Sequence, residues 1–318
     1  MAKITEYGFE SKDEKHTRIR AVKWEPEEGS PVAVLQIVHG MQEYIDRYGE
    51  FAEYLAGKGF AVCGHDHIGH GMSVEYSEDR GIMHCDRPDD VMVEDMFTHY
   101  EMIRDMYPDI PYFILGHSMG SYLLRKYLSV KSHLLHDVKG AIIMGTGTES
   151  DAALIAGRAI CNIVSKVKGR DYRSKFIPKL MFNANYKDFD ITGEHPENSW
   201  LSRNTENVLA FLDKSKPMNR CDFSVNGYKI LIYATWFDNR MSNIRKMDRN
   251  IPVIFVSGDR DPVGGLGKGT RKAYDKFRAA GFSDLTIKLY EGYRHEILNE
   301  IGREIVYNDL YEWMQKRF

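Results

Sequence analysis

The sequence has no long hydrophobic run and no excess of basic charge. No stretch of its 318 residues reaches 18 consecutive apolar residues, so no transmembrane helix is predicted. The first residues lack the apolar segment of a signal peptide, and we expect a cytoplasmic protein. A formal net charge of -3 argues against nonspecific binding to nucleic acid, which is not an expected partner. A helix lying on a membrane surface needs only one apolar face, so transient contact of that kind stays open.

Cysteine is scarce, and no pair has CxxC spacing. The chain has four cysteines, at Cys63, Cys85, Cys161 and Cys221. This spacing favours reduced, buried thiols over a disulfide framework.

The dense run from His65 to His70 lacks the H-x-H-x-D-H order of metallohydrolases. We therefore expect neither a metal nor a cofactor.

Apolar, strand-like runs alternate with helical patterns through the first half of the chain. These runs cover residues 32–38, 61–64, 112–115 and 138–144. The alternation stops after Gly145, where amphipathic segments such as Ser150 to Gly169 follow, and it resumes with the runs 251–257 and 285–290. The pattern predicts an α/β fold with a mostly parallel sheet flanked by helices. Residues 1–145 and 246–318 would form this core domain, and residues 146–245 an inserted, mainly helical cap.

Between a strand-like run and a helical pattern lies Gly116-His-Ser-Met-Gly120. A serine hydroxyl is a poor nucleophile unless it is exposed beside a base, and a sharp strand-to-helix turn provides the exposure. The flanking glycines, Gly116 and Gly120, leave room for such a turn. The pattern indicates a nucleophile elbow, with Ser118 as the candidate nucleophile.

A base and an acid follow the last two predicted strands. His295 comes after the run 285–290, and Asp259 and Asp261 come after the run 251–257. The carboxyl ends of parallel strands meet at one edge of a sheet, so Ser118, Asp261 and His295 are expected to converge there. We prefer Asp261 to Asp259 because it lies further past the strand end. The order serine, aspartate, histidine is that of the α/β-hydrolase arrangement.

Acyl transfer also requires fixed donors for the oxyanion of the tetrahedral intermediate. The backbone N–H of Met119, directly after the nucleophile, is one candidate. The loop after the first core strand, His39 to Glu43, is the expected source of the second. Gly40 permits a tight turn in this loop, and the N–H of Met41 is the candidate donor.

Five motifs in this order resemble the monoacylglycerol lipase and lysophospholipase group of α/β hydrolases, within a serine aminopeptidase-type hydrolase family. They are His39-Gly-Met-Gln-Glu-Tyr-Ile-Asp-Arg-Tyr48, Asp66-His-Ile-Gly-His-Gly-Met-Ser73, Gly116-His-Ser-Met-Gly120, Gly258-Asp-Arg-Asp261 and Arg294-His295. The resemblance implies a triad at Ser118, Asp261 and His295, with oxyanion donors at Met41 and Met119. Two positions depart from the group: Tyr44 stands where histidine is common, and Ile68 replaces a common arginine.

The predicted cap is rich in large apolar side chains, such as Trp200, Phe211 and Tyr233. Most of these would pack the cap, and the remainder would line a pocket for an acyl chain. We therefore expect a cofactor-independent serine ester hydrolase for small, lipid-like acyl esters, of lysophospholipase or monoacylglycerol lipase type. An acyltransferase or aminopeptidase with the same triad remains an alternative, as does a catalytically silent binding protein. The sequence does not determine the preferred acyl-chain length, the preferred headgroup or the oligomeric state.

Overall fold

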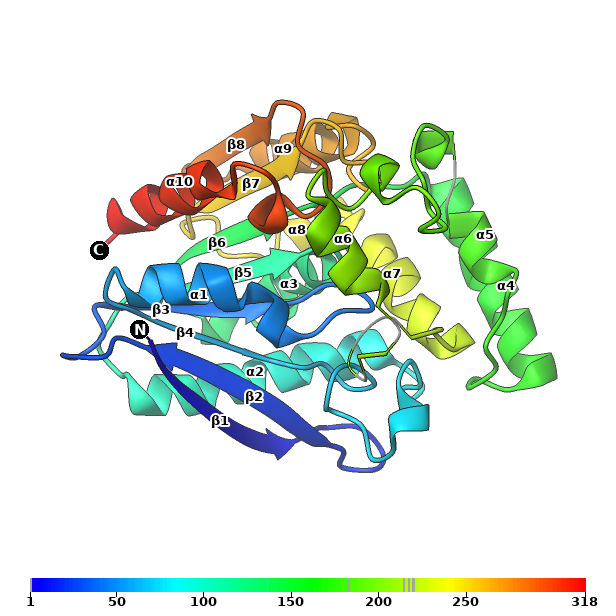
Figure 1. Cartoon of the computed structure of the whole chain (residues 1–318), viewed down its shortest axis with the longest axis horizontal. Helices are drawn as coiled ribbons and strands as arrows, with labels where there is room; N and C mark the ends of the chain where they lie inside the picture. The colour runs from blue at the N-terminus through cyan, green and yellow to red at the C-terminus, as the bar shows by residue number, and fades with distance from the viewer. Residues whose placement is uncertain (1, 136, 182–183, 214, 217, 219–220) are drawn as a thin grey trace.

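The computed structural model describes residues 2–318 except 136, 182–183, 214, 217 and 219–220. Eight strands form one sheet in the order β1-β2-β4-β3-β5-β6-β7-β8 (Figure 1). Their bounds are Lys3–Glu10 (β1), Arg18–Glu25 (β2), Ala33–Val38 (β3), Phe60–His65 (β4), Tyr112–His117 (β5), Val138–Met144 (β6), Val253–Gly258 (β7) and Leu285–Tyr290 (β8). All neighbouring strands from β4 to β8 pair in parallel, which confirms the mostly parallel sheet.

Two layers of helices cover the sheet. One face carries α1 (Gly49–Ala56) and α10 (Arg303–Gln315), and the other carries α2 (Pro88–Met106), α3 (Met119–Val130) and α9 (Lys268–Ala280). Alternate residues of β5 serve the two faces, because side chains of a strand point to opposite sides. Phe113 and Leu115 pack with the α1 and α10 layer, whereas Ile114 packs with the α2 and α3 layer. This burial on both faces explains why the central strands read as continuous apolar runs.

The first two strands were not among the predicted elements. β1 and β2 pair antiparallel with each other, and β2 pairs antiparallel with β4. Their sequences mix apolar with charged residues because this end of the sheet is half exposed. Ile19 and Trp24 are buried in β2, while Arg18 stays exposed.

Between β6 and β7 the chain is mainly helical. The helices are α4 (Asp151–Lys168), α5 (Ile177–Met181), α6 (Thr205–Leu212), α7 (Val225–Asp238) and α8 (Met241–Ile244). Short 3-10 helices lie at Ile45–Tyr48, Ser77–Asp79, Ser132–Leu134, Ala184–Tyr186, Pro196–Asn198 and Ile297–Asn299. The amphipathic segment from Ser150 to Gly169 is α4: Ser150 caps it by accepting from Ala153 N–H at 3.2 Å, and Gly169 ends it.

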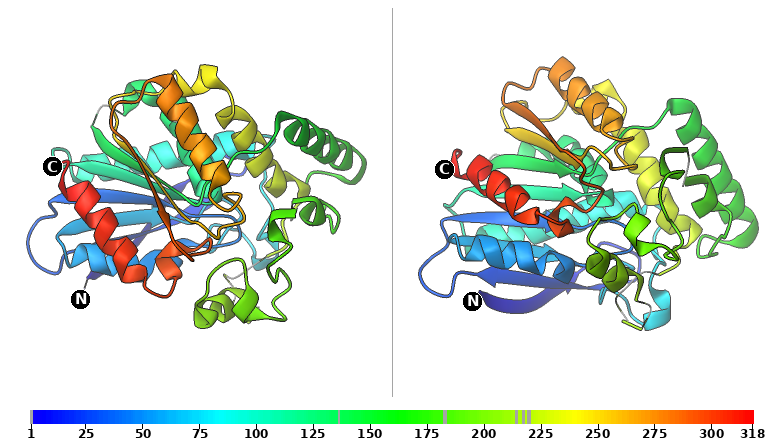
Figure 2. Two further views of the ribbon diagram at one scale, coloured as in Figure 1. Left: turned by 90° about the horizontal axis from the view of Figure 1, so that it is seen from above. Right: turned by 45° about the horizontal axis from the view of Figure 1, so that its top comes forward.

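These helices lie on the side toward which the parallel strands point (Figure 1). α4 stands furthest from the sheet, as Figure 2 shows in two further orientations. The described helices between β6 and β7 therefore lie next to the carboxyl ends of the strands, where the site is expected.

Within the residues described, no helix is both long and apolar enough to cross a membrane.

Candidate active site

Ser118 occupies a sharp turn between β5, which ends at His117, and α3, which begins at Met119. Its backbone has φ 52° and ψ −120°, a conformation that costs about 1–3 kcal/mol for a residue with a side chain. The surroundings hold this turn: Ser118 N–H donates to Met144 O at 3.0 Å. A Cβ on Gly116 would lie 2.4 Å from Gly120 O, so the turn needs glycine there. This geometry is that of the predicted nucleophile elbow.

Asp261 and His295 meet beyond the ends of β7 and β8. His295 Nδ1 lies 3.0 Å from Asp261 Oδ1, and both side chains are buried. Ser257 Oγ and Val263 N–H also donate to the carboxylate. Burial by itself raises the pKa of Asp261, but the charge and hydrogen bond of His295 and the other donors lower it below its ordinary value. An ionised Asp261 holds the proton of His295 on Nδ1 and leaves Nε2 as the basic nitrogen.

Asp259 does not contact His295 in this way. Its Oδ1 accepts from Gly292 N–H at 2.8 Å, which is turn chemistry between the ends of β7 and β8. Asp261, two residues further along the loop, is the carboxylate that the structure places on the imidazole.

His295 lies over the carboxyl ends of β5 and β6, next to the elbow. Its ring is centred 4.7 Å from that of His117, and a Cβ on Gly145 would lie 3.1 Å from its Cε1. In the described part of the chain, its ring is hydrogen-bonded to Asp261, and no hydrogen bond joins it to Ser118. Such bonds are often long without substrate and shorten in the complex.

The two candidate oxyanion donors flank Ser118. Met119 is the first residue of α3, and N–H groups in the first turn of a helix have no partner within it. The positive end of the helix dipole also favours negative charge there. The loop that carries Met41 lies against the nucleophile, since a Cβ on Gly40 would be 3.0 Å from Ser118 Cβ. Both donors therefore border Ser118, one at the start of α3 and the other on the loop after β3.

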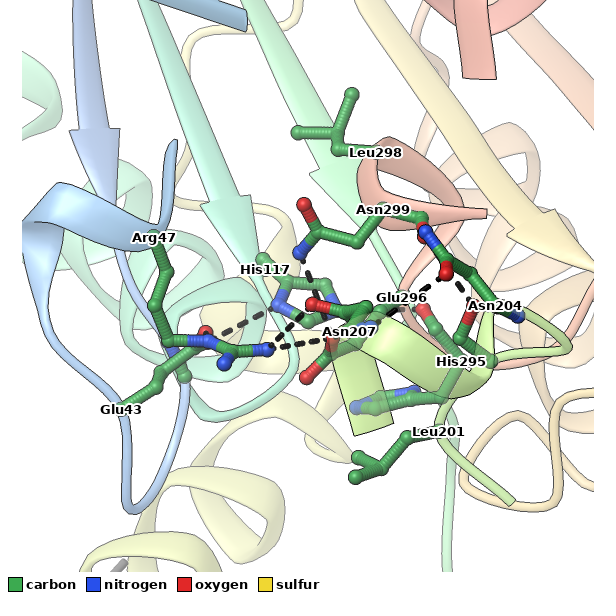
Figure 3. A network of polar contacts seen from close by, with 12 residues as sticks. Glu43, Arg47, His117, Leu201, Asn204, Asn207, His295, Glu296, Leu298 and Asn299 are labelled. Atoms are coloured by element: carbon green, nitrogen blue, oxygen red, sulfur yellow. Dashed lines mark hydrogen bonds and ion pairs between the residues drawn. The ribbon is translucent and has the colours of Figure 1, made fainter. Parts of the chain in front are cut away.

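A buried ionic network, which sequence reasoning did not identify, surrounds these loops (Figure 3). Arg47 lies between two carboxylates, with Nε 3.4 Å from Glu43 Oε2 and one Nη 2.6 Å from Glu296 Oε2. Glu43 Oε1 also accepts from His117 Nδ1 at 3.1 Å, and His117 Nε2 faces His295 O at 3.3 Å. The network thus joins the oxyanion loop, the elbow and the loop of the candidate base.

His117 and Arg47 are the basic partners of the two carboxylates. His117 Nδ1 lies 3.1 Å from Glu43 Oε1 and 2.9 Å from the Tyr48 hydroxyl oxygen, and its Nε2 lies 3.3 Å from His295 O. Burial lowers the pKa of His117, but the hydrogen bond and charge of Glu43 outweigh burial and raise it. Burial likewise raises the pKa of Glu43, and His117 and Arg47 bring it far below its ordinary value. Arg47 therefore lies between the carboxylates of Glu43 and Glu296, and a protonated His117 adds a second positive charge beside Glu43. The i,i+4 spacing of Glu43 and Arg47 was the one local signal of this network.

The segment before α6 contacts the candidate base directly. The ring of Trp200 is centred 5.1 Å from that of His295, and His295 N–H donates to Trp200 O at 3.4 Å. From α6 itself, Asn207 Nδ2 donates to Glu296 Oε2 at 2.6 Å (Figure 3). A cavity of about 20 Å³ lies here, and residues from the oxyanion loop and from 190–212 line it, among them Gln42, Trp200, Leu201, Phe211 and Leu212. This small cavity, which polar side chains such as Asp190 and Ser199 also line, adjoins the oxyanion loop.

The histidine-rich run 65–70 is a buried structural loop. The carboxylate of Asp66 accepts from the N–H groups of Ile45 and Met72. His67 N–H donates to His39 Nε2 at 3.0 Å. Among the residues that the structure describes, no group of three or more histidine, cysteine, aspartate or glutamate side chains could hold a metal ion. All four cysteines are free thiols.

The sheet, the elbow and the adjoining aspartate and histidine define an α/β hydrolase with the site of a serine hydrolase acting on esters. The family model described as serine aminopeptidase, S33, matches residues 29–302, and the chain belongs to this family.

Individual relatives cover nearly the whole chain. The chain is 27% identical to a monoglyceride lipase of Mus musculus over an alignment of 303 residues, which covers 92% of this chain and 86% of the relative. It is 26% identical over 294 residues to a monoacylglycerol lipase of Mycolicibacterium smegmatis, with coverage of 92% and 90%. A thermostable carboxyl esterase from Bacillus coagulans, solved in complex with glycerol, superposes with a TM-score of 0.87 at 26% identity and covers 100% and 99% of the two chains. The resemblance inferred from the five motifs is confirmed.

Proposed function

We propose that the protein hydrolyses the ester bond of a monoacylglycerol or a lysophospholipid through an acyl-enzyme on Ser118. One observation carries the proposal: the His295 and Asp261 pair adjoins a serine held at φ 52° on the elbow before α3. Relatives named monoglyceride lipase and monoacylglycerol lipase support the choice of a lipid ester.

In the first half-reaction, Ser118 Oγ attacks the ester carbonyl carbon while His295 Nε2 takes the hydroxyl proton. The N–H groups of Met41 and Met119 bind the oxyanion that forms. When the intermediate collapses, His295 gives its proton to the departing alcohol oxygen, and the acyl group remains on Ser118. Water then attacks the acyl-enzyme by the same route and releases the fatty acid. Asp261 stabilises the imidazolium in both steps.

The surroundings favour an ester over the free amine that an aminopeptidase must recognise. A positively charged amine needs an available carboxylate. Beside the site, Glu43 and Glu296 are both held by Arg47, and Asn207 also donates to Glu296. The apolar side chains of Trp200, Leu201, Phe211 and Leu212 instead offer contacts for an acyl chain.

We assign residues 146–245 as a cap that admits the acyl chain by moving. A cavity of about 20 Å³ has room for roughly one water molecule, not for an alkyl chain. Trp200 lies directly on His295, so substrate entry requires the segment around Trp200 to shift.

We also propose that the outer face of α4 contacts lipid surfaces. Ile155, Ile163 and Val167 share one face of the helix and are 56%, 63% and 70% exposed. Lys166, in the last turn of this helix, lies on the same face. An exposed face that combines apolar side chains with lysine is typical of interfacial helices.

The substrate is tested with two esters that carry the same acyl chain, a monoacylglycerol and a lysophosphatidylcholine, and with the amide of an amino acid as the aminopeptidase substrate. We expect hydrolysis of the esters, loss of activity in Ser118→Ala, and no amide cleavage. A preference for the amide, or an active Ser118→Ala protein, would contradict the proposal. Transfer of the acyl group to added alcohol in preference to water would favour an acyltransferase.

Lipid contact is tested with monoacylglycerol presented in phosphatidylcholine vesicles. Ile163→Glu should lower vesicle binding and the rate on vesicles by at least tenfold, because a charge replaces an apolar anchor, while the rate on a soluble short-chain ester stays the same. Ile305→Glu is the matched control, since Ile305 is 59% exposed on α10. Equal effects of the two substitutions would refute the assignment to α4.

A further inference from the structure

Gly40, the residue before the candidate donor Met41, is held at both ends. Its N–H donates to Glu43 Oε1, and its C=O accepts from His39 Nδ1 at 2.8 Å. The peptide between Gly40 and Met41 is trans, like every peptide of the described residues. In a planar trans peptide the N–H points away from the C=O. The contact between His39 and the Gly40 carbonyl therefore sets the direction of the Met41 N–H.

His39 is itself fixed in one orientation. Its side chain is fully buried, and its Nε2 accepts from His67 N–H at 3.0 Å. Because Nε2 is the acceptor, the proton of a neutral ring sits on Nδ1 and is available to Gly40 O. Burial lowers the pKa of His39, which agrees with a neutral ring. The rings of His67 and His70, centred 4.2 and 5.2 Å away, leave the imidazole little freedom to turn.

The peptide that His39 holds lies directly against the nucleophile. A Cβ on Gly40 would lie 3.0 Å from Ser118 Cβ and 2.4 Å from Glu43 Oε1. Rotation of this peptide would therefore turn the Met41 N–H away from the carbonyl oxygen of a substrate bound at Ser118. An oxyanion donor is effective only when its direction is set before the reaction.

We propose that His39 is a positioning residue of the oxyanion hole: its Nδ1–H holds the Gly40 carbonyl so that the Met41 N–H faces the oxyanion. This inference rests on the proposed function, in which Met41 N–H is an oxyanion donor. His39 acts through the backbone and does not touch the substrate.

Two substitutions separate the two hydrogen bonds of His39. In His39→Asn the amide nitrogen takes the place of Nδ1 and still donates to Gly40 O. In His39→Gln the longer amide reaches the place of Nε2, accepts from His67 N–H and leaves the Gly40 carbonyl free. Loss of an oxyanion donor lowers kcat about 100- to 1000-fold, so a donor that is only misdirected should cost roughly 10- to 100-fold.

We expect kcat of His39→Gln to fall by that factor with KM within about twofold, and His39→Asn to recover most of the rate. The inhibition constant of a trifluoromethyl ketone, whose adduct with the serine carries an oxyanion, should rise in parallel with the fall in kcat. Equal losses in both variants, or an unchanged inhibition constant in His39→Gln, would overturn the inference. If the wild-type protein cleaves no ester, the proposed function and this inference are refuted together. If the wild-type protein is active and His39→Gln keeps its kcat, the inference alone is refuted.

A second measurement needs only the folded wild-type protein. The ¹⁵N shifts of the imidazoles report which nitrogen carries the proton. The inference requires the Nδ1–H form of His39, and the Nε2–H form would overturn it even if a variant failed to fold.

Discussion

Replacing Arg47 by methionine removes the cation that lies between two buried carboxylates. The side chains of Arg47, Glu43 and Glu296 are 7%, 5% and 3% exposed. In the native network Arg47 contacts both carboxylates (Figure 3). Without Arg47, one buried negative charge has no cation, and water has little access to it.

The distances set the size of the effect. At an effective dielectric constant near 20, contacts of 3.4 and 2.6 Å correspond to gross attractions of about 5 and 6 kcal/mol. The cost of burying the charges offsets much of this, and removal of one partner of a buried pair typically costs about 3–5 kcal/mol. We expect Arg47→Met to lose that much free energy of unfolding, out of the 5–15 kcal/mol that domains usually have.

The assay is unfolding in urea, monitored by tryptophan fluorescence. Adding Glu296→Gln to Arg47→Met should restore part of the loss, because it removes the uncompensated charge. Arg278→Met is the control: Arg278 pairs with Asp275 at 2.9 Å, but the two side chains are 68% and 55% exposed, so its loss should be below about 0.5 kcal/mol. A loss below 1 kcal/mol for Arg47→Met would refute the reasoning.

The other predictions concern pH, the elbow and the oxyanion loop. Glu43 raises the pKa of His117 in the folded protein. The pairing therefore contributes its full stabilisation below about pH 6.5, and this stabilisation is lost as the pH rises through the folded-state pKa of His117. The stability difference between wild type and Glu43→Gln should therefore shrink from pH 6 to pH 9, and a constant difference would contradict the assignment. Gly120→Ala should destabilise the fold by at least about 1–3 kcal/mol in thermal unfolding, since its Cβ would lie 2.0 Å from Val38 O; an unchanged Tm would count against this. Met41→Pro, which deletes the N–H, should lower kcat about 100- to 1000-fold and Met41→Ala far less, and equal losses would exclude Met41 N–H as a donor.

The central sheet could be predicted because its strands are buried on both faces. β5 is apolar from Tyr112 to Leu115, and the glycines around Ser118 mark the turn that follows. The fold class followed from these runs and from their alternation with helical patterns. β1 and β2 were not predicted because their exposed faces carry charged residues, so that neither strand reads as an apolar run.

The candidate triad could be named from the sequence because each member directly follows a strand. Asp261 and His295 lie 34 positions apart, yet parallel strands bring their loops together. The ionic network had no comparable signal. Arg47 meets Glu296 across 249 positions, and only the packed loops show that contact. The position of the Gly40 carbonyl relative to His39 likewise depends on the folded backbone.

The most direct test of Ser118 as the nucleophile is labelling with a fluorophosphonate, which reacts with activated serines, and identification of the labelled peptide by mass spectrometry. We predict a single label on Ser118, in the peptide that joins β5 to α3, and no label in Ser118→Ala together with loss of ester hydrolysis. A label on another serine, or ester hydrolysis that persists in Ser118→Ala, would contradict it.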